Sequence, residues 1–309
     1  MYAVVLTHQS ALTYWKSQYR LDARSEVAYA KRVIKIAPKL NQLKVVLSCD
    51  IKNPLHVLVA DKNLRRCNNV CVSHVWKHPL PKGSVVDSGR GFYVISPELC
   101  FVVMARYLSF AELVEFGFYL CGSYVGIGEK IYSCRPLTTK NQIKDCIEKN
   151  RKVAGAGKAE DALKYVLENS ASPMETKLAM LLCLPPKRGG YGFVAPTLNY
   201  QIDKQANKWG TTFANYYKCD LTWPEARVAL EYDSNLYHTG ADHLASDSIR
   251  RTELINLGYT VISVASPQVT TTMGTKNLAN ALAKQMNRRM RLFEPRFSEA
   301  HAKLRRELF

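Results

Sequence analysis

Residues 216 to 238 read YYKCDLTWPEARVALEYDSNLYH, and this stretch decides how the second half of the chain folds. Its alternation of apolar and polar residues is typical of a buried β-hairpin, with residues 223 to 226 (WPEA) as the expected turn. Three acids, Asp220, Glu231 and Asp233, lie among its apolar residues. Burial of a carboxylate destabilises a fold unless a cation or a set of donors compensates the charge. The stretch therefore predicts a hairpin that gathers negative charge for a cation.

The expected turn sets where the acids would lie. It pairs Asp220 with Ala229 and puts Glu231 two residues farther along the same face, onto which Asp233 also alternates. Diagonal neighbours on one face are ~7–8 Å apart at the backbone, within reach of carboxylate side chains. Carboxylates this close raise one another's pKa unless a cation intervenes, and oxygen-only ligands suit Mg²⁺ or Mn²⁺. The alternative is that the acids are solvated at frayed strand ends or paired with lysines.

The length of 309 residues suggests two domains. The run NSASP at 169 to 173 is the expected boundary, so we predict domains at 1–170 and 171–309. Both read as mixed α/β, the first being a separate α+β domain. The segment GAGK at 155 to 158 does not follow a strand and reads as a linker rather than a phosphate-binding loop.

The pattern of the first domain predicts particular elements. Strands are expected at 54 to 61 and 69 to 76, with a hairpin that turns at 88 to 91. Helices are expected to begin after Ser96 and after Ser109, the second through a capping box with Glu112, and polar helices follow from about 139 to 168.

The second domain is predicted to run helix, strand, strand, strand, helix, strand, helix. The strands are expected near Phe193, through LNYQID (198 to 203) and in the hairpin, with YTVISVA (259 to 265) last. A basic helix through LANALAKQMNRRMRLF (278 to 293) is expected to finish the fold.

The chain is strongly basic, with 43 Lys and Arg against 26 Asp and Glu and a net charge of +17. The residues up to 170 hold 25 basic and 14 acidic side chains, which leaves 43 − 25 = 18 basic and 26 − 14 = 12 acidic side chains after it. Such an excess in both halves favours a polyanionic partner, with nucleic acid before membrane. The alternative is that the charge only keeps the protein soluble.

The nine cysteines show no paired framework, which indicates reduced thiols and a cytoplasmic protein. The start lacks the features of a signal peptide, and no apolar run approaches the ~18 residues of a membrane helix, so no membrane partner is expected. The set Cys67, Cys71, His74 and His78 has the wrong spacing for a zinc finger, and we expect no zinc there.

Residues 172 to 264 resemble the very-short-patch-repair-like endonuclease branch of the PD-(D/E)XK nuclease superfamily. The residues that carry the resemblance are Glu175 on a helix, Asp220 at a strand end, EYDS at 231 to 234, His238, and the helix pattern Asp247, Arg250, Leu254 and Gly258. The resemblance implies a core sheet flanked by helices, one or two divalent ions, and cleavage of nucleic-acid phosphodiesters. The lysine of the superfamily's name is absent, with Asp233 in its place.

The resemblance also implies roles for single residues. Asp220, Glu231 and Glu175 would hold Mg²⁺ or Mn²⁺, although a capping box with Ser172 explains Glu175 equally well. His238 would transfer protons, since imidazole titrates near neutrality, and a surface loop histidine is the alternative. Apart from the resemblance, the basic charge predicts six phosphate-binding residues: Arg250, Arg251, Lys284, Arg288, Arg289 and Arg291. For Arg250, an ion pair with Asp247 one turn earlier is the alternative.

The first half resembles the AbiE-type abortive-infection antitoxin regulators. The segments THQSAL, PLHVLV, HVWKHPLP and FYVISPELCFVVMA carry the likeness, whereas the winged helix usual at the start of those regulators has no counterpart. A nucleic-acid or protein partner is therefore expected for this half. The whole chain predicts a metal-dependent endonuclease acting on DNA, with a non-catalytic, antitoxin-like nucleic-acid-binding regulator as the alternative.

Overall fold

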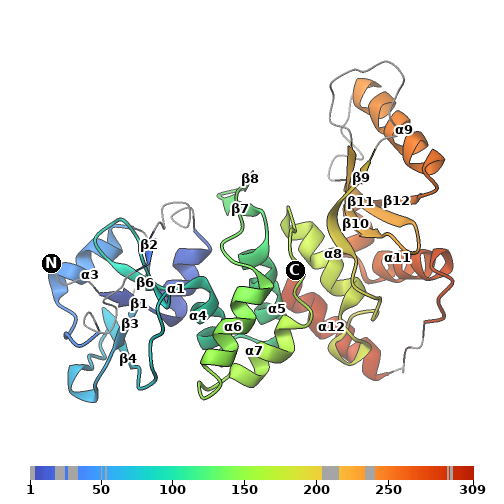
Figure 1. Cartoon of the computed structure of the whole chain (residues 1–309). Helices are drawn as coiled ribbons and strands as arrows, with labels where there is room; N and C mark the ends of the chain where they lie inside the picture. Colours follow the sequence, from blue (N-terminus) through green and yellow to red (C-terminus); the bar gives the residue numbers. More distant parts are fainter. Residues whose placement is uncertain are drawn as a thin grey trace. The chain divides into compact units, whose positions relative to one another are not determined.

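A computed structural model describes residues 4–17, 25–26, 34–49, 51–52, 54–203, 216–233, 241–290, 292 and 295–309, with the side chains of 25–26 and 241–247 outside that description. The fold is mixed α/β, with three sheets and the helices that accompany them (Figure 1). The chain divides into two compact units, Met1–Val166 and Leu167–Phe309, against an expected boundary between 170 and 171. No helix in the described part of the chain is both long enough and apolar enough to cross a bilayer.

The first unit contains a six-stranded sheet in the order β2-β5-β6-β1-β3-β4. The pairs β1–β6 and β3–β4 are parallel and the other pairs are antiparallel. The strands are β1 (Val5–Leu6), β2 (Ser25–Glu26), β3 (Leu55–Val59), β4 (Cys71–Val75), β5 (Val85–Asp87) and β6 (Tyr93–Ile95). The strands expected at 54 to 61 and 69 to 76 and the hairpin that turns at 88 to 91 are confirmed. A separate hairpin of β7 (Tyr124–Ile127) and β8 (Lys130–Ser133) was not predicted.

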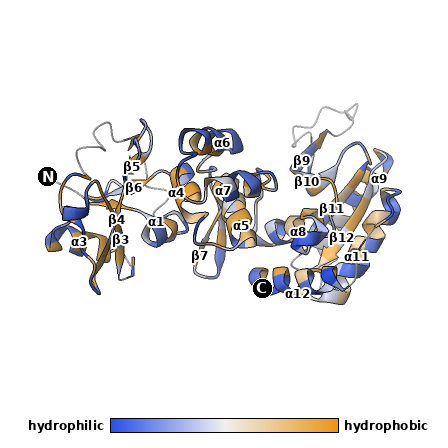
Figure 2. Ribbon diagram, turned by 90° about the horizontal axis from the view of Figure 1, so that it is seen from below, coloured by the Kyte–Doolittle hydropathy of each residue, from blue (hydrophilic) through white to orange (hydrophobic). Residues whose placement is uncertain are grey.

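The helices of the first unit begin where polar side chains cap them. Ser96 Oγ accepts a hydrogen bond from the Leu99 amide, and Ser109 and Glu112 form both bonds of a capping box, as predicted. The helices are α1 (His8–Trp15), α3 (Leu40–Leu47), α4 (Pro97–Met104), α5 (Phe110–Cys121), α6 (Lys140–Lys149) and α7 (Ala156–Leu163), with a 3₁₀ turn η2 (Lys62–Leu64). Figure 2 shows that α4 is almost wholly hydrophobic whereas α6 is largely hydrophilic, in keeping with their buried and exposed positions.

The segment GAGK is not a linker, which corrects the expectation from the sequence. Gly155 is the N-cap of α7 with a φ of +99°, and residues 156 to 158 form the first turn. A Cβ on Gly155 would lie 2.8 Å from the Arg106 amide nitrogen, so the position requires glycine both for its backbone angle and for its close approach to another segment. Gly155 therefore shapes a helix start and its packing.

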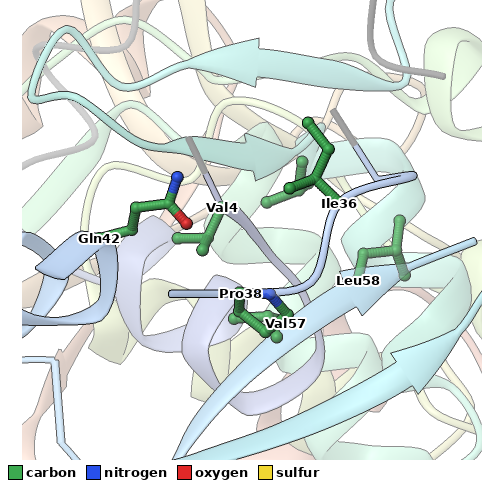
Figure 3. Close-up of a pocket in the computed structure, with 7 residues that line it drawn as sticks. Val4, Ile36, Pro38, Gln42, Val57 and Leu58 are labelled. Atoms are coloured by element: carbon green, nitrogen blue, oxygen red, sulfur yellow. The ribbon is translucent and has the colours of Figure 1, made fainter. Parts of the chain in front are cut away.

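Large aromatic side chains fill the core of the first unit, among them Tyr14, Trp15, Phe92 and Phe101. Trp15 Nε1 donates to the Ile95 carbonyl at 3.0 Å, so the indole is both packed and satisfied. A small cavity of about 10 Å³ lies beside Val4, Ile36 and Leu58 (Figure 3). It has room for about one water molecule, and so does not serve as a ligand site.

The second unit has a four-stranded mixed sheet in the order β12-β11-β10-β9. The strands are β9 (Thr197–Asp203), β10 (Tyr216–Trp223), β11 (Val228–Asp233) and β12 (Thr260–Ala265). The helices are α8 (Pro173–Cys183), α9 (Ala241–Asn256), α10 (Ser266–Thr270), α11 (Thr272–Gln285) and α12 (Arg296–Leu308), with a 3₁₀ turn η3 (Pro186–Arg188). Helices α8 and α9 flank the sheet (Figures 1 and 2). Leu254 of α9 packs into a cluster with Ile202, Cys219, Ala229 and Val261.

Three expectations about the second unit are wrong. Phe193 lies outside any strand, because its amide bonds to the Leu182 carbonyl at the end of α8. The basic helix expected through residue 293 stops at Gln285, and Asn287 just beyond it has a φ of +47°, a left-handed conformation that cannot continue a helix. The basic helix also does not finish the fold, because the chain continues into a separate helix, α12.

The hairpin is present, but its register differs from the expected one. The loop is the four residues 224 to 227, with Trp223 opposite Val228 and Thr222 opposite Ala229. The turn closes by a bond from the Arg227 amide to the Pro224 carbonyl, and Arg227 has a φ of +51°. Asp220 is therefore not paired with Ala229.

Candidate functional site

The β9–β10 ladder is interrupted at Asp220, and the β10–β11 ladder ends next to it, at Leu221. Regular pairing with β11 covers Leu221 to Trp223, and pairing with β9 omits Asp220 and Asn199, which has a φ of +51°. In place of a backbone partner, the Tyr232 amide donates to Asp220 Oδ2 at 2.8 Å. The carboxylate of Asp220 is thus fixed between two strands by a charge-assisted bond.

Asp220 and Glu231 line the same pocket, of about 420 Å³. Its walls come from β10, β11, β12 and α9: Asp220, Glu231, Tyr232, Asp233, Ser248, Arg250, Arg251, Val261 and Ser263. The structure therefore brings together three predicted acids and two predicted arginines. It does so even though the expected register was wrong by two residues.

Arg250 occupies the centre of this arrangement. Its Nη2 donates to Glu231 Oε1 at 2.5 Å and to the Lys218 carbonyl at 2.6 Å. The Arg250 and Glu231 side chains retain 36% and 24% of their exposure. Arg250 Nε is buried and has no hydrogen-bond partner among the described residues. The guanidinium therefore neutralises Glu231 and still has one buried donor to offer.

Glu175 lies behind Asp220, on the first turn of α8. Its side chain is almost fully buried, and Oε2 accepts from the Ala171 amide at 2.8 Å and from Asn199 Nδ2 at 2.7 Å. Ser172 Oγ accepts from the Glu175 amide, which is half of the expected capping box, whereas the carboxylate reaches the residue before the cap. Glu175 is thus a helix-start residue whose charge also acts on Asp220.

Around Asp220, the effects that disfavour a charged carboxylate outweigh those that favour it. Burial raises the pKa of Asp220 to about 7, and the charges of Glu175 and then Glu231 act in the same direction, against the Tyr232 amide and Arg250. Burial also raises the pKa of Glu175, against its bonds from Ala171 and Asn199. A carboxyl group in this condition is stabilised by any cation that reaches it.

This raised pKa predicts a pH dependence of stability. In EDTA, the free energy of unfolding should fall as pH rises from about 4 to about 7, because unfolded Asp220 loses its proton near 3.8 whereas the folded residue keeps it until about 7. The effect should be about 2 kcal/mol, allowing for partial exposure. Urea titrations of the full chain at stepwise pH measure it.

Two variants serve as controls for the pH dependence. Asp220→Asn should remove this part of the slope, and Glu175→Gln should shift it toward lower pH because one repelling charge is lost. A slope that is identical in the wild type and Asp220→Asn would show that Asp220 titrates normally in the folded protein.

The donor set bears on whether a metal fits. The described carboxylates offer oxygen atoms only, which are the ligands preferred by Mg²⁺ and Mn²⁺. No group of three or more His, Cys, Asp and Glu side chains placed to hold an ion occurs in the described part of the chain. Three described acids, Asp220, Glu231 and Asp233, share the pocket with Arg250. Asp220 and Glu231 are the candidate ligands predicted from the sequence, and Glu175 lies behind them.

Other predicted residues are placed differently or lie outside the described residues. His238 and Arg291 are outside them, as is the side chain of Asp247. Lys284 and Arg289 are exposed, whereas the Arg288 guanidinium lies over the Phe193 ring, 4.6 Å from its centroid. Arg251 Nη2 donates weakly to the Val261 carbonyl, at 3.4 Å.

Two residues of the site were not predicted from the sequence. Asn199 bridges Glu175 and the Asn169 carbonyl, and the Lys218 carbonyl anchors Arg250. Asparagine tolerates the left-handed backbone that Asn199 adopts, and an asparagine inside a strand pattern is a weak signal for such a break. A backbone carbonyl gives no signal at all in a sequence.

Comparisons with known proteins add a distant likeness. No protein-family model matches the chain, and no solved structure matches it. Similar proteins are "Uncharacterized protein MT2308" of Mycobacterium tuberculosis strain CDC 1551 / Oshkosh and "Uncharacterized protein Rv2248" of strain ATCC 25618 / H37Rv. Each is 24% identical over 149 residues, which is 48% of this chain and 49% of the relative. The chain spans about half the length of the curated relatives it matches, whose names state no activity.

Proposed function

We propose that the second unit is a divalent-metal-dependent endonuclease that hydrolyses phosphodiester bonds of nucleic acid, with DNA as the expected substrate. The observation that carries this proposal is the meeting of Asp220, Glu231 and Arg250 in one polar pocket at the interrupted hairpin. The raised pKa of Asp220 supports it, because burial and its acidic neighbours leave that carboxyl short of a cation.

Asp220 and Glu231 are the residues that would hold Mg²⁺ or Mn²⁺, with Glu175 behind them. Such an ion, when bound, would polarise the scissile phosphoryl group and neutralise the charge that develops on it. Asp220 is suited to this task because the Tyr232 amide fixes Oδ2, while no hydrogen bond from the described residues uses Oδ1. Asp233 lines the same pocket at the position where the superfamily has a lysine.

Arg250 is the residue that would orient the phosphate. The buried Nε has no partner among the described residues, so a phosphate oxygen in the pocket would supply the missing acceptor. His238 is the residue that the resemblance assigns to proton transfer, and it lies outside the described residues.

One observation favours the non-catalytic alternative. Arg250 already neutralises Glu231, which is how a nuclease fold that has lost its metal would satisfy a leftover acid. A nucleic-acid-binding regulator with this fold would bind DNA in the same way with Mg²⁺ and with EDTA, and would cleave under neither condition.

Incubation with supercoiled plasmid and with single-stranded DNA tests the proposal directly. Mg²⁺ or Mn²⁺ should convert the plasmid to nicked or linear forms or shorten the single strand, and EDTA should abolish both products. Intact substrates in all metals would support the regulator instead.

The basic residues near the end of α11 predict how binding depends on salt. Lys284 and Arg289 are exposed, so neutralising either should lower the slope of log affinity against log salt concentration by about one. Arg288→Gln is the matched control: it should leave the slope unchanged, because the Arg288 guanidinium stacks on Phe193. Titrations in EDTA between low and moderate salt measure the slopes, and unchanged slopes after Lys284→Gln and Arg289→Gln would mean that this surface contacts no phosphate.

A further inference from the structure

Three histidines far apart in the sequence meet on the first unit. His8 begins α1, His56 lies in β3 and His74 lies in the neighbouring strand β4. The His8 and His74 rings are stacked with centroids 3.6 Å apart, and the His56 and His74 rings are 5.0 Å apart and nearly parallel. One ring nitrogen of the pair His56 Nδ1 and His74 Nε2 donates to the other at 2.9 Å. The result is a cluster of three imidazole rings supplied by α1, β3 and β4.

Burial lowers the pKa of all three imidazoles, so this cluster is neutral at physiological pH. Burial lowers the pKa of His8 to about 3 and that of His74 to about 4, with repulsion between the imidazoles and from Arg106 and Arg65 adding to it. Among the described residues, no carboxylate contributes to the pKa shift of His8 or of His74. The imidazoles therefore act as flat rings with one donor and one acceptor each, rather than as cations.

The cluster continues into an exposed aromatic and cationic surface. Tyr107, just after α4, is 55% exposed, and its ring meets His8 edge-on with centroids 5.1 Å apart. The Arg106 guanidinium lies 6.0 Å from the Tyr107 centroid. Arg65 is exposed and close enough to act on His74. The aromatic cluster thus has an arginine at either end, Arg65 near His74 and Arg106 near Tyr107.

The backbone at His8 is also unusual. His8 has a φ of +47° at the junction between β1 and α1, a region that a residue with a side chain rarely adopts. Its Nδ1 is hydrogen-bonded to Thr7 Oγ1 at 3.0 Å, and no described residue bonds to Nε2. Strain of this kind is retained where the surrounding structure fixes a side chain in one place, often at functional sites.

We propose that His8, His56, His74 and Tyr107 form a binding site for an unpaired base of a single-stranded nucleic acid, with Arg65 and Arg106 meeting the adjoining phosphates. Proteins bind unpaired bases by stacking them on aromatic side chains, histidine included, inside a positively charged surface. A metal site is disfavoured, because the His8 and His74 rings stack on one another and the His56 and His74 ring nitrogens bond to one another. The site belongs to the first unit and does not depend on the proposed nuclease.

Fluorescence anisotropy with the full chain in EDTA tests this site. The probes are a labelled thymidine oligonucleotide of about 20 nucleotides and an abasic strand of the same length, which keeps the phosphates and lacks the bases. The wild type should bind the thymidine strand more tightly than the abasic strand. Tyr107→Ala should weaken binding of the thymidine strand about 10-fold and leave binding of the abasic strand unchanged. Tyr107→Phe should behave as the wild type does.

Tyr132→Ala is the matched control, because Tyr132 is an exposed tyrosine of the same unit on β8 and is 46% exposed. It should bind both strands as the wild type does. Three results would overturn the proposal: a wild type that binds the two strands equally or neither, a Tyr107→Ala variant that keeps full affinity for the thymidine strand, or one that loses both strands alike. Because EDTA is present throughout, a failed nuclease assay leaves each of these outcomes unaffected.

Discussion

Asp220→Asn is expected to abolish metal-dependent cleavage while leaving the protein folded. Asparagine keeps the size of the side chain and an oxygen that accepts from the Tyr232 amide, but it removes the charge that would bind the ion. The free energy of unfolding in EDTA should stay the same or rise near pH 7, because burial, Glu175 and Glu231 all disfavour a charged Asp220. Plasmid cleavage rates and urea denaturation measure the two effects.

The control for this variant is Asp145→Asn on α6, where an exposed acid loses the same charge far from the pocket in sequence. Its cleavage rate should equal that of the wild type. Cleavage by Asp220→Asn at the wild-type rate would remove Asp220 from the mechanism.

Arg250→Met is expected to change ion affinity and cleavage in opposite directions. Removing the guanidinium frees Glu231 from a bond of 2.5 Å, so affinity for Mn²⁺ should rise about 10-fold, the equivalent of one charge-assisted hydrogen bond. Cleavage should fall about 10²-fold, because the donor that orients the phosphate is lost. Mn²⁺ titration without nucleic acid and single-turnover cleavage separate the two effects.

Arg251→Met provides a matched control for Arg250→Met. Arg251 lines the same pocket and carries the same charge, but its only described hydrogen bond is the long one to the Val261 carbonyl. If both variants raise ion affinity equally, the general charge of the pocket is responsible and the Glu231 pair is not. If Arg250→Met binds Mn²⁺ more weakly than the wild type, the guanidinium does not compete with the ion.

Local signals predicted much of the fold because their chemistry is local. Ser96 and Ser109 cap helices by bonds to residues three positions away, and strands β3 and β4 follow from alternation over a few residues. The helix end at Gln285 was missed because the apolar spacing continues beyond it. What stops the helix is the left-handed backbone at Asn287, a conformation that asparagine tolerates without requiring it.

The candidate site was predicted in its residues but not in its geometry. The turn of the hairpin has a left-handed Arg227, a residue that gives no turn signal, so the register came out two residues wrong. The break at Asp220 and the Arg250–Glu231 pair depend on segments 12 and 19 residues apart that only the packed unit brings together. Sequence spacing alone does not specify such contacts.

The central claim is that this hairpin holds a divalent cation. Direct titration with Mn²⁺ tests it, with the wild type and Asp220→Asn compared in the absence of nucleic acid. Electron paramagnetic resonance measures the free ion. We predict a saturable site in the wild type and an affinity at least about 10-fold weaker in Asp220→Asn. Equal binding by the two proteins, or no saturable binding by the wild type, would contradict the claim.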